Sequence, residues 1–129
     1  MNAMIARAAP LAAVLALAAS AAHAAEAGKS PSQCFWTRDV NGFNAVDDKT
    51  VMVRVGVRDV YQFDMLGPCS DINWSEQIAI ISRGGSRICS SLDAEIVTPS
   101  TIGPHRCAVK MVRKLTPAEV AALPAKHKP

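Results

Sequence analysis

The chain has 129 residues, of which 50% are hydrophobic, and a formal net charge of +3 at pH 7. This length is typical of one domain and excludes an enzyme built from two domains with a cleft between them. Because 14 basic residues nearly balance 11 acidic ones, the charge does not suggest a nucleic-acid-binding protein, in which a basic patch dominates. Composition therefore predicts one small globular domain with no nucleic-acid partner.

Residues 1–24 have the pattern of a secretory signal peptide. Arg7 supplies the positive charge, residues 11–19 (LAAVLALAA) form an apolar run, and Ala22-His23-Ala24 forms an A-x-A cleavage site. The run is shorter than the roughly 18–20 residues that cross a membrane, and no later stretch reaches that length. We therefore expect cleavage before Ala25 and an exported protein, periplasmic or secreted, without a transmembrane segment.

Three segments follow the predicted signal peptide. Residues 25–33 (AEAGKSPSQ) are small and polar and indicate a flexible lead-in. Residues 34–124 hold all the strand patterns and are expected to form a single β-rich domain. Residues 125–129 (AKHKP) are expected to be a loose basic tail.

The clearest strand pattern lies between Thr50 and Leu66. Apolar residues alternate with other residues in two successive runs, which is typical of two strands with one buried face. A turn centred on Arg58 keeps both apolar sets on the same face, since a shift of register by one residue moves every side chain to the other face. The predicted pairs are Val55 with Tyr61, Val53 with Phe63, and Val51 with Met65.

Other local patterns complete the expected domain. Thr116, Pro117 and Glu119 have the spacing of a helix N-terminus, with an N-cap, a proline in the first turn and a capping box. The remaining expectations are turns at Asn41-Gly42 and Asp47-Asp48, one helical turn within 71–77, strands at 78–81, 87–90, 94–98 and 107–114, a hairpin turn at 83–86, and Val109 and Met111 on one face of the last strand.

Four cysteines, Cys34, Cys69, Cys89 and Cys107, lie in the predicted domain. Their number is even and an exported protein meets an oxidising compartment, so we expect two structural disulfides. No C-x-x-C occurs, which argues against a zinc or thioredoxin-like site. Three connectivities are possible; we favour the nested one, Cys34–Cys107 with Cys69–Cys89.

Few residues suggest chemistry, and we predict no catalytic residue, metal ligand or cofactor. His105 is the one histidine of the predicted domain and could act as a ligand or general base, but no partner lies near it in sequence. Arg83, Arg87 and Arg106 could form an anion-binding patch if their loops converge. Trp36 and Trp74 could contact a ligand, although core packing is the simpler expectation.

The ordered set of short motifs resembles the bacterial domain-of-unknown-function family number 6491, small exported proteins with four cysteines. The stretches that carry the resemblance begin with Cys34-Phe35-Trp36-Thr37 and end with residues 115–124 (LTPAEVAALP). Between them lie the motifs at 47–55, 60–61, 66–69 and 83–89. The resemblance implies export, one domain and a shared role for the cysteines, and it implies no activity.

We expect a mainly β fold: a small, disulfide-stapled antiparallel sheet or partly closed barrel with a short C-terminal helix. The function expected from this combination is a non-enzymatic binding or accessory protein of the cell envelope, with an envelope protein as partner, for example an enzyme that it inhibits. The alternative is a small periplasmic hydrolase or metal-dependent enzyme that uses His105. A redox role for one disulfide is a third hypothesis.

Overall fold

The computed structural model describes residues 34–129, so the predicted signal peptide (1–24) and lead-in (25–33) lie outside the described residues. The strands are β1 (Phe35–Trp36), β2 (Val40–Ala45), β3 (Thr50–Val55), β4 (Asp59–Met65), β5 (Ala79–Ser82), β6 (Arg87–Ile88), β7 (Ala94–Thr98) and β8 (His105–Lys114). The helix α1 (Pro117–Ala122) and three 3-10 turns, η2 (Thr37–Asp39), η3 (Ser91–Asp93) and η4 (Ala125–His127), complete the fold.

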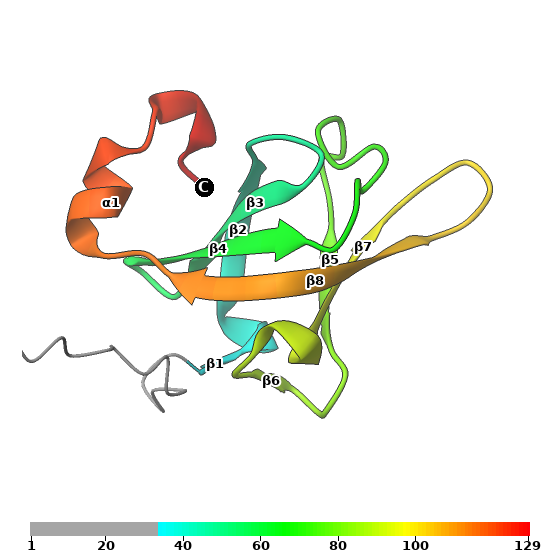
Figure 1. The fold of residues 1–129 in the computed structure, drawn as a ribbon, viewed down its shortest axis with the longest axis horizontal. Helices are drawn as coiled ribbons and strands as arrows, with labels where there is room; N and C mark the ends of the chain where they lie inside the picture. Colours follow the sequence, from blue (N-terminus) through cyan, green and yellow to red (C-terminus); the bar gives the residue numbers. More distant parts are fainter. Residues whose placement is uncertain (1–33) are drawn as a thin grey trace, which may run out of the picture.

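Six strands form one curved antiparallel sheet in the order β2-β3-β4-β8-β7-β5, and β1 pairs with β6 in a separate two-stranded sheet. The curvature makes the large sheet a half-barrel, with α1 at one end of β8 and the β7–β8 loop at the other (Figure 1). The mainly β prediction is therefore confirmed.

The β3–β4 hairpin is confirmed, but its register differs from the predicted one by two residues. Val53 pairs with Tyr61 and Val51 with Phe63, so the turn is centred on Val57 rather than Arg58. Gly56 opens the turn with φ +62°, a left-handed conformation that favours glycine. Both registers keep the apolar residues on one face, which is why alternation alone could not choose between them.

The core lies on the concave face of the large sheet. Phe63, Val51 and Val53 are fully buried there, and Phe35 packs against the Tyr61 ring with centroids 4.6 Å apart. The core cluster consists of Phe35, Val51, Val53, Val55, Tyr61, Phe63, Met65, Cys69, Ile72, Ile88, Ala94, Ile96, Cys107 and Val109.

The prediction that Val109 and Met111 share a face is wrong. The β4–β8 pairing shifts register between Asp64 and Met65, so that Met65 pairs with Val109 while Asp64 pairs with Met111. This bulge turns Met111 outward, to 39% exposure, and Val112 packs against the core instead.

Two predicted turns are also corrected. Asn41-Gly42 lies inside β2, where the register is irregular between Val40 and Gly42; the absent side chain of Gly42 leaves room for the Arg54 guanidinium, 3.1 Å from where a Cβ would stand. The turn at 83–86 exists, but the strands on either side of it do not pair with each other. Instead β5 pairs with β7, and β6 pairs with β1 through Phe35 and Ile88.

Other local predictions have mixed outcomes. The Asp47-Asp48 turn is confirmed: Asp47 Oδ1 accepts hydrogen bonds from the backbone N–H groups of Lys49 and Thr50, each at 2.8 Å. The single turn expected around Trp74 is present: the Ser75 N–H donates to the Asp71 carbonyl, four residues earlier, at 2.9 Å, and the turn does not continue into a helix. The tail at 125–129 is not loose, because it contains η4 and the Lys128 carbonyl accepts a hydrogen bond from Asn44 Nδ2 at 3.4 Å.

The predicted helix start is confirmed in detail. Thr116 caps α1 by accepting a hydrogen bond from the Glu119 N–H at 3.2 Å, and the Glu119 carboxylate accepts one from the Thr116 N–H at 2.7 Å. Arg113 Nη1 also donates to Glu119 at 2.8 Å. Two hydrogen bonds hold the pKa of Glu119 below its usual value. The one from the Thr116 backbone N–H has the larger effect, and the one from the Arg113 guanidinium comes next.

Candidate functional site

Both disulfides differ from the predicted nested pairing: the structure joins Cys34 to Cys89 and Cys69 to Cys107. Strand pairing explains each one. Cys34 precedes β1 and Cys89 follows β6, so the antiparallel β1–β6 ladder brings the two residues together. Cys69 lies just after β4, whose last residue pairs with Val109 of β8, two residues beyond Cys107. The predicted pairing failed because these two ladders were not recognised in the sequence.

The Cys69–Cys107 disulfide joins the loop between β4 and β5 to strand β8 at one end of the half-barrel. That loop spans 66–78, and Cys107 lies three residues past a second loop, 99–104, which is the tip of the β7–β8 hairpin (Figure 1). Cys69 is completely buried and Cys107 is 6% exposed. A second link is the hydrogen bond from the buried Thr98 Oγ1 to the Ser70 carbonyl at 3.4 Å. The two loops are therefore held side by side.

Within the first loop, a tight turn presents Trp74 to solvent. The Asp71 carbonyl accepts hydrogen bonds from the Trp74 N–H at 3.1 Å, the Ser75 N–H at 2.9 Å and Ser75 Oγ at 2.8 Å. Ile72 beside it is 1% exposed and anchors the turn in the core, whereas Trp74 is 85% exposed. The expectation that Trp74 packs in the core is therefore wrong.

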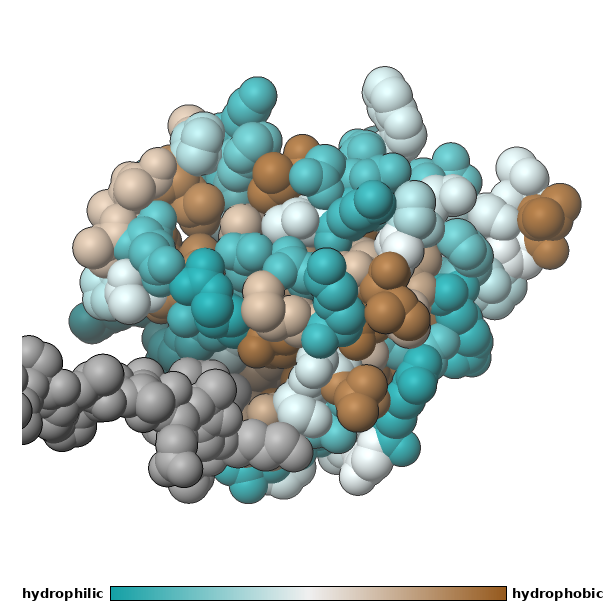
Figure 2. Space-filling view, in the orientation of Figure 1, coloured by the Kyte–Doolittle hydropathy of each residue, from teal (hydrophilic) through white to brown (hydrophobic). Residues whose placement is uncertain are grey.

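A cleft of about 630 Å³ lies between these loops, beside Trp74. Carboxylate, amide and hydroxyl side chains line it together with the indole, and none of its described lining residues is a lysine or an arginine. At the neighbouring hairpin tip, Ile102 is 98% exposed, and Figure 2 shows an apolar group at the outer end of this hairpin. The cleft is lined by Asp71, Trp74, Ser75, Glu76, Gln77, Pro99, Ser100 and Thr101.

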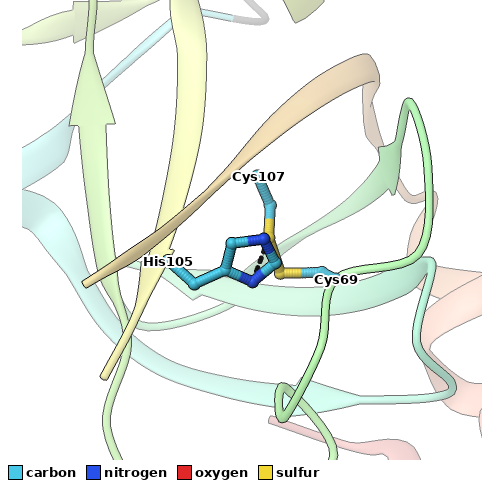
Figure 3. Close-up of side chains that lie close together, drawn as sticks. All are labelled: Cys69, His105 and Cys107. Carbon is cyan, nitrogen blue, oxygen red and sulfur yellow. Dashed lines mark hydrogen bonds between the residues drawn. A yellow bond between two sulfur atoms is a disulfide. The ribbon is translucent and has the colours of Figure 1, made fainter. Parts of the chain in front are cut away.

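His105, the histidine singled out from the sequence, lies at the start of β8 against the same disulfide (Figure 3). Its Nδ1 is 3.9 Å from Cys107 Sγ. Among residues 34–129, no hydrogen bond or ion pair joins His105 to a carboxylate. The ligand atoms of Cys69, His105 and Cys107 lie within 4.8 Å of one another. Both sulfurs, however, are bonded to each other, so they are not thiolate ligands for a metal.

The three arginines predicted as an anion-binding patch do not converge. Arg83 Nε and Arg106 Nη1 both contact the Glu95 carboxylate, at 3.4 Å and 3.5 Å. Arg87 lies elsewhere, with its guanidinium 5.7 Å from the Trp36 ring centroid. Glu95 is the shared ion-pair partner of two of the three arginines, and its single negative charge leaves this group with a net positive charge.

Trp36 is 40% exposed, and two guanidinium groups lie close to its ring. The Arg38 guanidinium is 5.1 Å from the ring centroid, and Arg87 is the residue that pairs with Trp36 in the β1–β6 ladder. These cation–π contacts account for the ring's position without a ligand. Trp74 is therefore the more exposed of the two tryptophans, at 85% against 40% for Trp36.

Sequence reasoning named Trp74 as a ligand contact but preferred a core position for it, and it missed the cleft residues around it. One available signal is the polar composition around Trp74 in Asp71–Gln77 (DINWSEQ), in which Ile72 is the one other apolar residue. Ile72 anchors this loop in the core, and Trp74, two residues further along the chain, faces solvent.

Comparison with protein families gives one result. The model of a family described as a family of unknown function, DUF6491, matches residues 2–128 of the chain. Neither the curated proteins nor the solved structures contain a match. Over residues 34–129, no helix is long and apolar enough to span a membrane.

Proposed function

Because the chain belongs to DUF6491, a family of unknown function, we propose its role from its own geometry: an exported, non-enzymatic binding domain of the cell envelope. It binds an envelope component at the cleft beside Trp74. Such a domain serves as an accessory protein or as an inhibitor of an envelope enzyme.

The observation that carries this proposal is the exposure of Trp74 on an ordered turn. Burying an indole in a core contributes on the order of 4 kcal/mol, and this chain forgoes most of that contribution at a position 85% exposed. The turn itself is fixed by three hydrogen bonds to the Asp71 carbonyl. A tryptophan exposed on a fixed backbone turn beside a cleft is typical of a recognition surface.

Export is supported by the two disulfides, because such bonds persist in oxidising compartments. The signal-peptide pattern of residues 1–24 supports the same conclusion. We therefore place the protein in the periplasm or outside the cell.

The alternative, a hydrolase or metal-dependent enzyme based on His105, gains no support from the contacts of that residue. Its Nδ1 contacts a disulfide sulfur, and a general base needs a proton donor within hydrogen-bond reach. The binding role is therefore preferred.

Binding is tested by co-sedimentation of the purified, oxidised domain with the washed wall and membrane fraction of the cells that produce it. We expect the wild type to sediment with the fraction and Trp74→Ala to remain in the supernatant. Leu92→Ala is the matched control, because Leu92 is also exposed, at 76%, but does not line the cleft. If the wild type also stays in the supernatant, envelope binding is wrong.

Export is tested separately by expressing the full chain and releasing the envelope contents by osmotic shock. The protein is expected in the shock fluid with Ala25 as its N-terminal residue. Retention in the cytoplasm with Met1 intact would contradict the export proposal without affecting the binding test.

A further inference from the structure

We propose that the cleft beside Trp74 binds a saccharide, with the indole stacked on one face of a sugar ring and the surrounding polar side chains bonded to its hydroxyl groups. This inference rests on the proposed binding function and names the class of ligand that the cleft takes.

The first support is the shape and rigidity of the aromatic platform. Trp74 presents its flat ring from a turn that is anchored in the core by Ile72, which is 1% exposed. The negative face of an indole attracts weakly positive C–H groups, and one face of a pyranose ring is lined by such groups. A single open platform fits a ring laid flat on it.

The second support is the set of polar groups around this platform. In the part of the chain that the structure describes, the side chains of Asp71, Glu76, Gln77 and Thr101 make no hydrogen bond or ion pair, although all four line the cleft. Two carboxylates accept hydrogen bonds, and the amide and hydroxyl both donate and accept. Sugar hydroxyls, which also donate and accept, match this mixture.

The charges of the residues that line the cleft also favour some classes of ligand over others. Among residues 34–129, the lining of the cleft includes no lysine or arginine, so these residues do not compensate the charge of a phosphate or an anionic lipid. A metal cation would use the two carboxylates and the side-chain oxygens of Gln77 and Thr101, but it leaves the exposed indole of Trp74 without a role. A polyhydroxylated ligand uses both kinds of group, and we therefore favour the saccharide.

The third support is that both walls of the cleft are fixed in advance. The Cys69–Cys107 disulfide and the bond from Thr98 Oγ1 to the Ser70 carbonyl join the loop 66–78 to β8 and β7, the two strands that carry the hairpin tip. On the hairpin wall, Ser100 Oγ donates to the Gly103 carbonyl at 2.6 Å. A preformed site binds with a smaller ordering cost than a mobile one. The cleft is largely open to solvent, so a ligand bound in it keeps one face exposed.

The test is a two-dimensional ¹H–¹⁵N NMR titration of the oxidised domain with chitotetraose, cellotetraose and maltotetraose. The two indole N–H resonances are assigned with Trp36→Phe. We expect the Trp74 resonance to shift saturably with at least one saccharide while the Trp36 resonance stays in place, because Trp36 lies outside the cleft. Trp74→Ala should weaken binding at least tenfold, Trp74→Phe should weaken it less, and the control Leu92→Ala should bind as the wild type does.

Three results would overturn the proposal. One is the absence of any shift at about 10 mM of each saccharide, which is tenfold above a weak dissociation constant of about 1 mM. Another is a shift of Trp74 with pentalysine and with none of the saccharides, which would assign the cleft to a cationic ligand. The third is unchanged saccharide binding by Trp74→Ala, with its fold verified by the NMR spectrum. Envelope co-sedimentation that persists without saccharide binding would leave the proposed function standing and reject this inference alone.

Discussion

At the scale of single residues, charged side chains stabilise the domain through a few well-defined contacts. The Glu119 carboxylate joins the N-terminus of α1 to Arg113 of β8, and Glu95 of β7 joins two arginines. Each of these contacts makes a separate prediction about the free energy of unfolding.

Glu119→Gln is expected to lower stability at neutral pH and to have little effect in acid. The folded state lowers the pKa of Glu119, so its charged form adds stability above the unfolded pKa of about 4.3. That contribution disappears as the pH falls through the lower folded value. Urea unfolding midpoints of both proteins, measured from pH 7 downward, should converge. A difference that is the same at every pH would contradict the prediction.

Glu95→Gln is expected to lower the free energy of unfolding by about 1 kcal/mol. The Glu95 side chain is 13% exposed and contacts both Arg83 and Arg106, so its loss leaves two guanidinium groups without their shared partner. Urea unfolding at pH 7 measures the change. Asp39→Asn is the control and should leave stability unchanged, because its ion pair with Arg38 is 3.8 Å long and solvent-exposed. Equal effects of the two substitutions would reject the argument.

At the scale of secondary-structure elements, local signals were reliable where they are self-contained. The capping box at Thr116 and Glu119 involves four consecutive residues, and the alternation in 50–66 specifies a buried face; both predictions are confirmed. Partners distant in sequence were not predicted. The pairing of β1 with β6 depends on Phe35 and Ile88, which are 53 residues apart, and no local pattern marks that contact.

The disulfide connectivity is checked by tryptic mapping of the oxidised protein under non-reducing conditions. Cleavage after lysine and arginine places the four cysteines in four different peptides, covering residues 30–38, 59–83, 88–106 and 107–110. We expect the first peptide linked to the third and the second linked to the fourth. A link between peptides 30–38 and 107–110 would restore the nested pairing and contradict the structure.

The two disulfides are expected to have different effects on the cleft. Replacing Cys69 and Cys107 by alanine removes a cross-link over 38 residues and should cost roughly 4 kcal/mol of stability by loop entropy. It should also weaken envelope co-sedimentation, since this disulfide ties the loop that carries Trp74 to strand β8. The matched pair Cys34→Ala and Cys89→Ala should lose similar stability and retain binding. Equal binding by both double variants would show that the loops do not depend on the cross-link.

At the scale of the whole molecule, fold class was accessible from the sequence and the candidate site was not. Alternating patterns, turn residues and an even number of cysteines are sufficient to predict a small β domain. The cleft, in contrast, depends on two loops brought together by strand pairing: Trp74 belongs to one and Thr101 to the other. Its residues show no distinctive pattern in the sequence, and only folding brings residues 71–77 and 99–101 together.

The crossed order of the disulfides has a consequence for biogenesis. Neither bond joins cysteines that are neighbours along the chain, because Cys69 lies between Cys34 and Cys89, and Cys89 lies between Cys69 and Cys107. A chain oxidised as it emerges from a translocation channel first exposes Cys34 and Cys69, a non-native pair. Thiol–disulfide exchange must then replace that bond. In a host that lacks disulfide isomerase, we expect the yield of correctly bonded protein, measured by the tryptic map, to fall. In a host that has the isomerase but lacks another folding factor, we expect that yield to be unchanged. The native connectivity thus makes maturation depend on bond reshuffling as well as on oxidation.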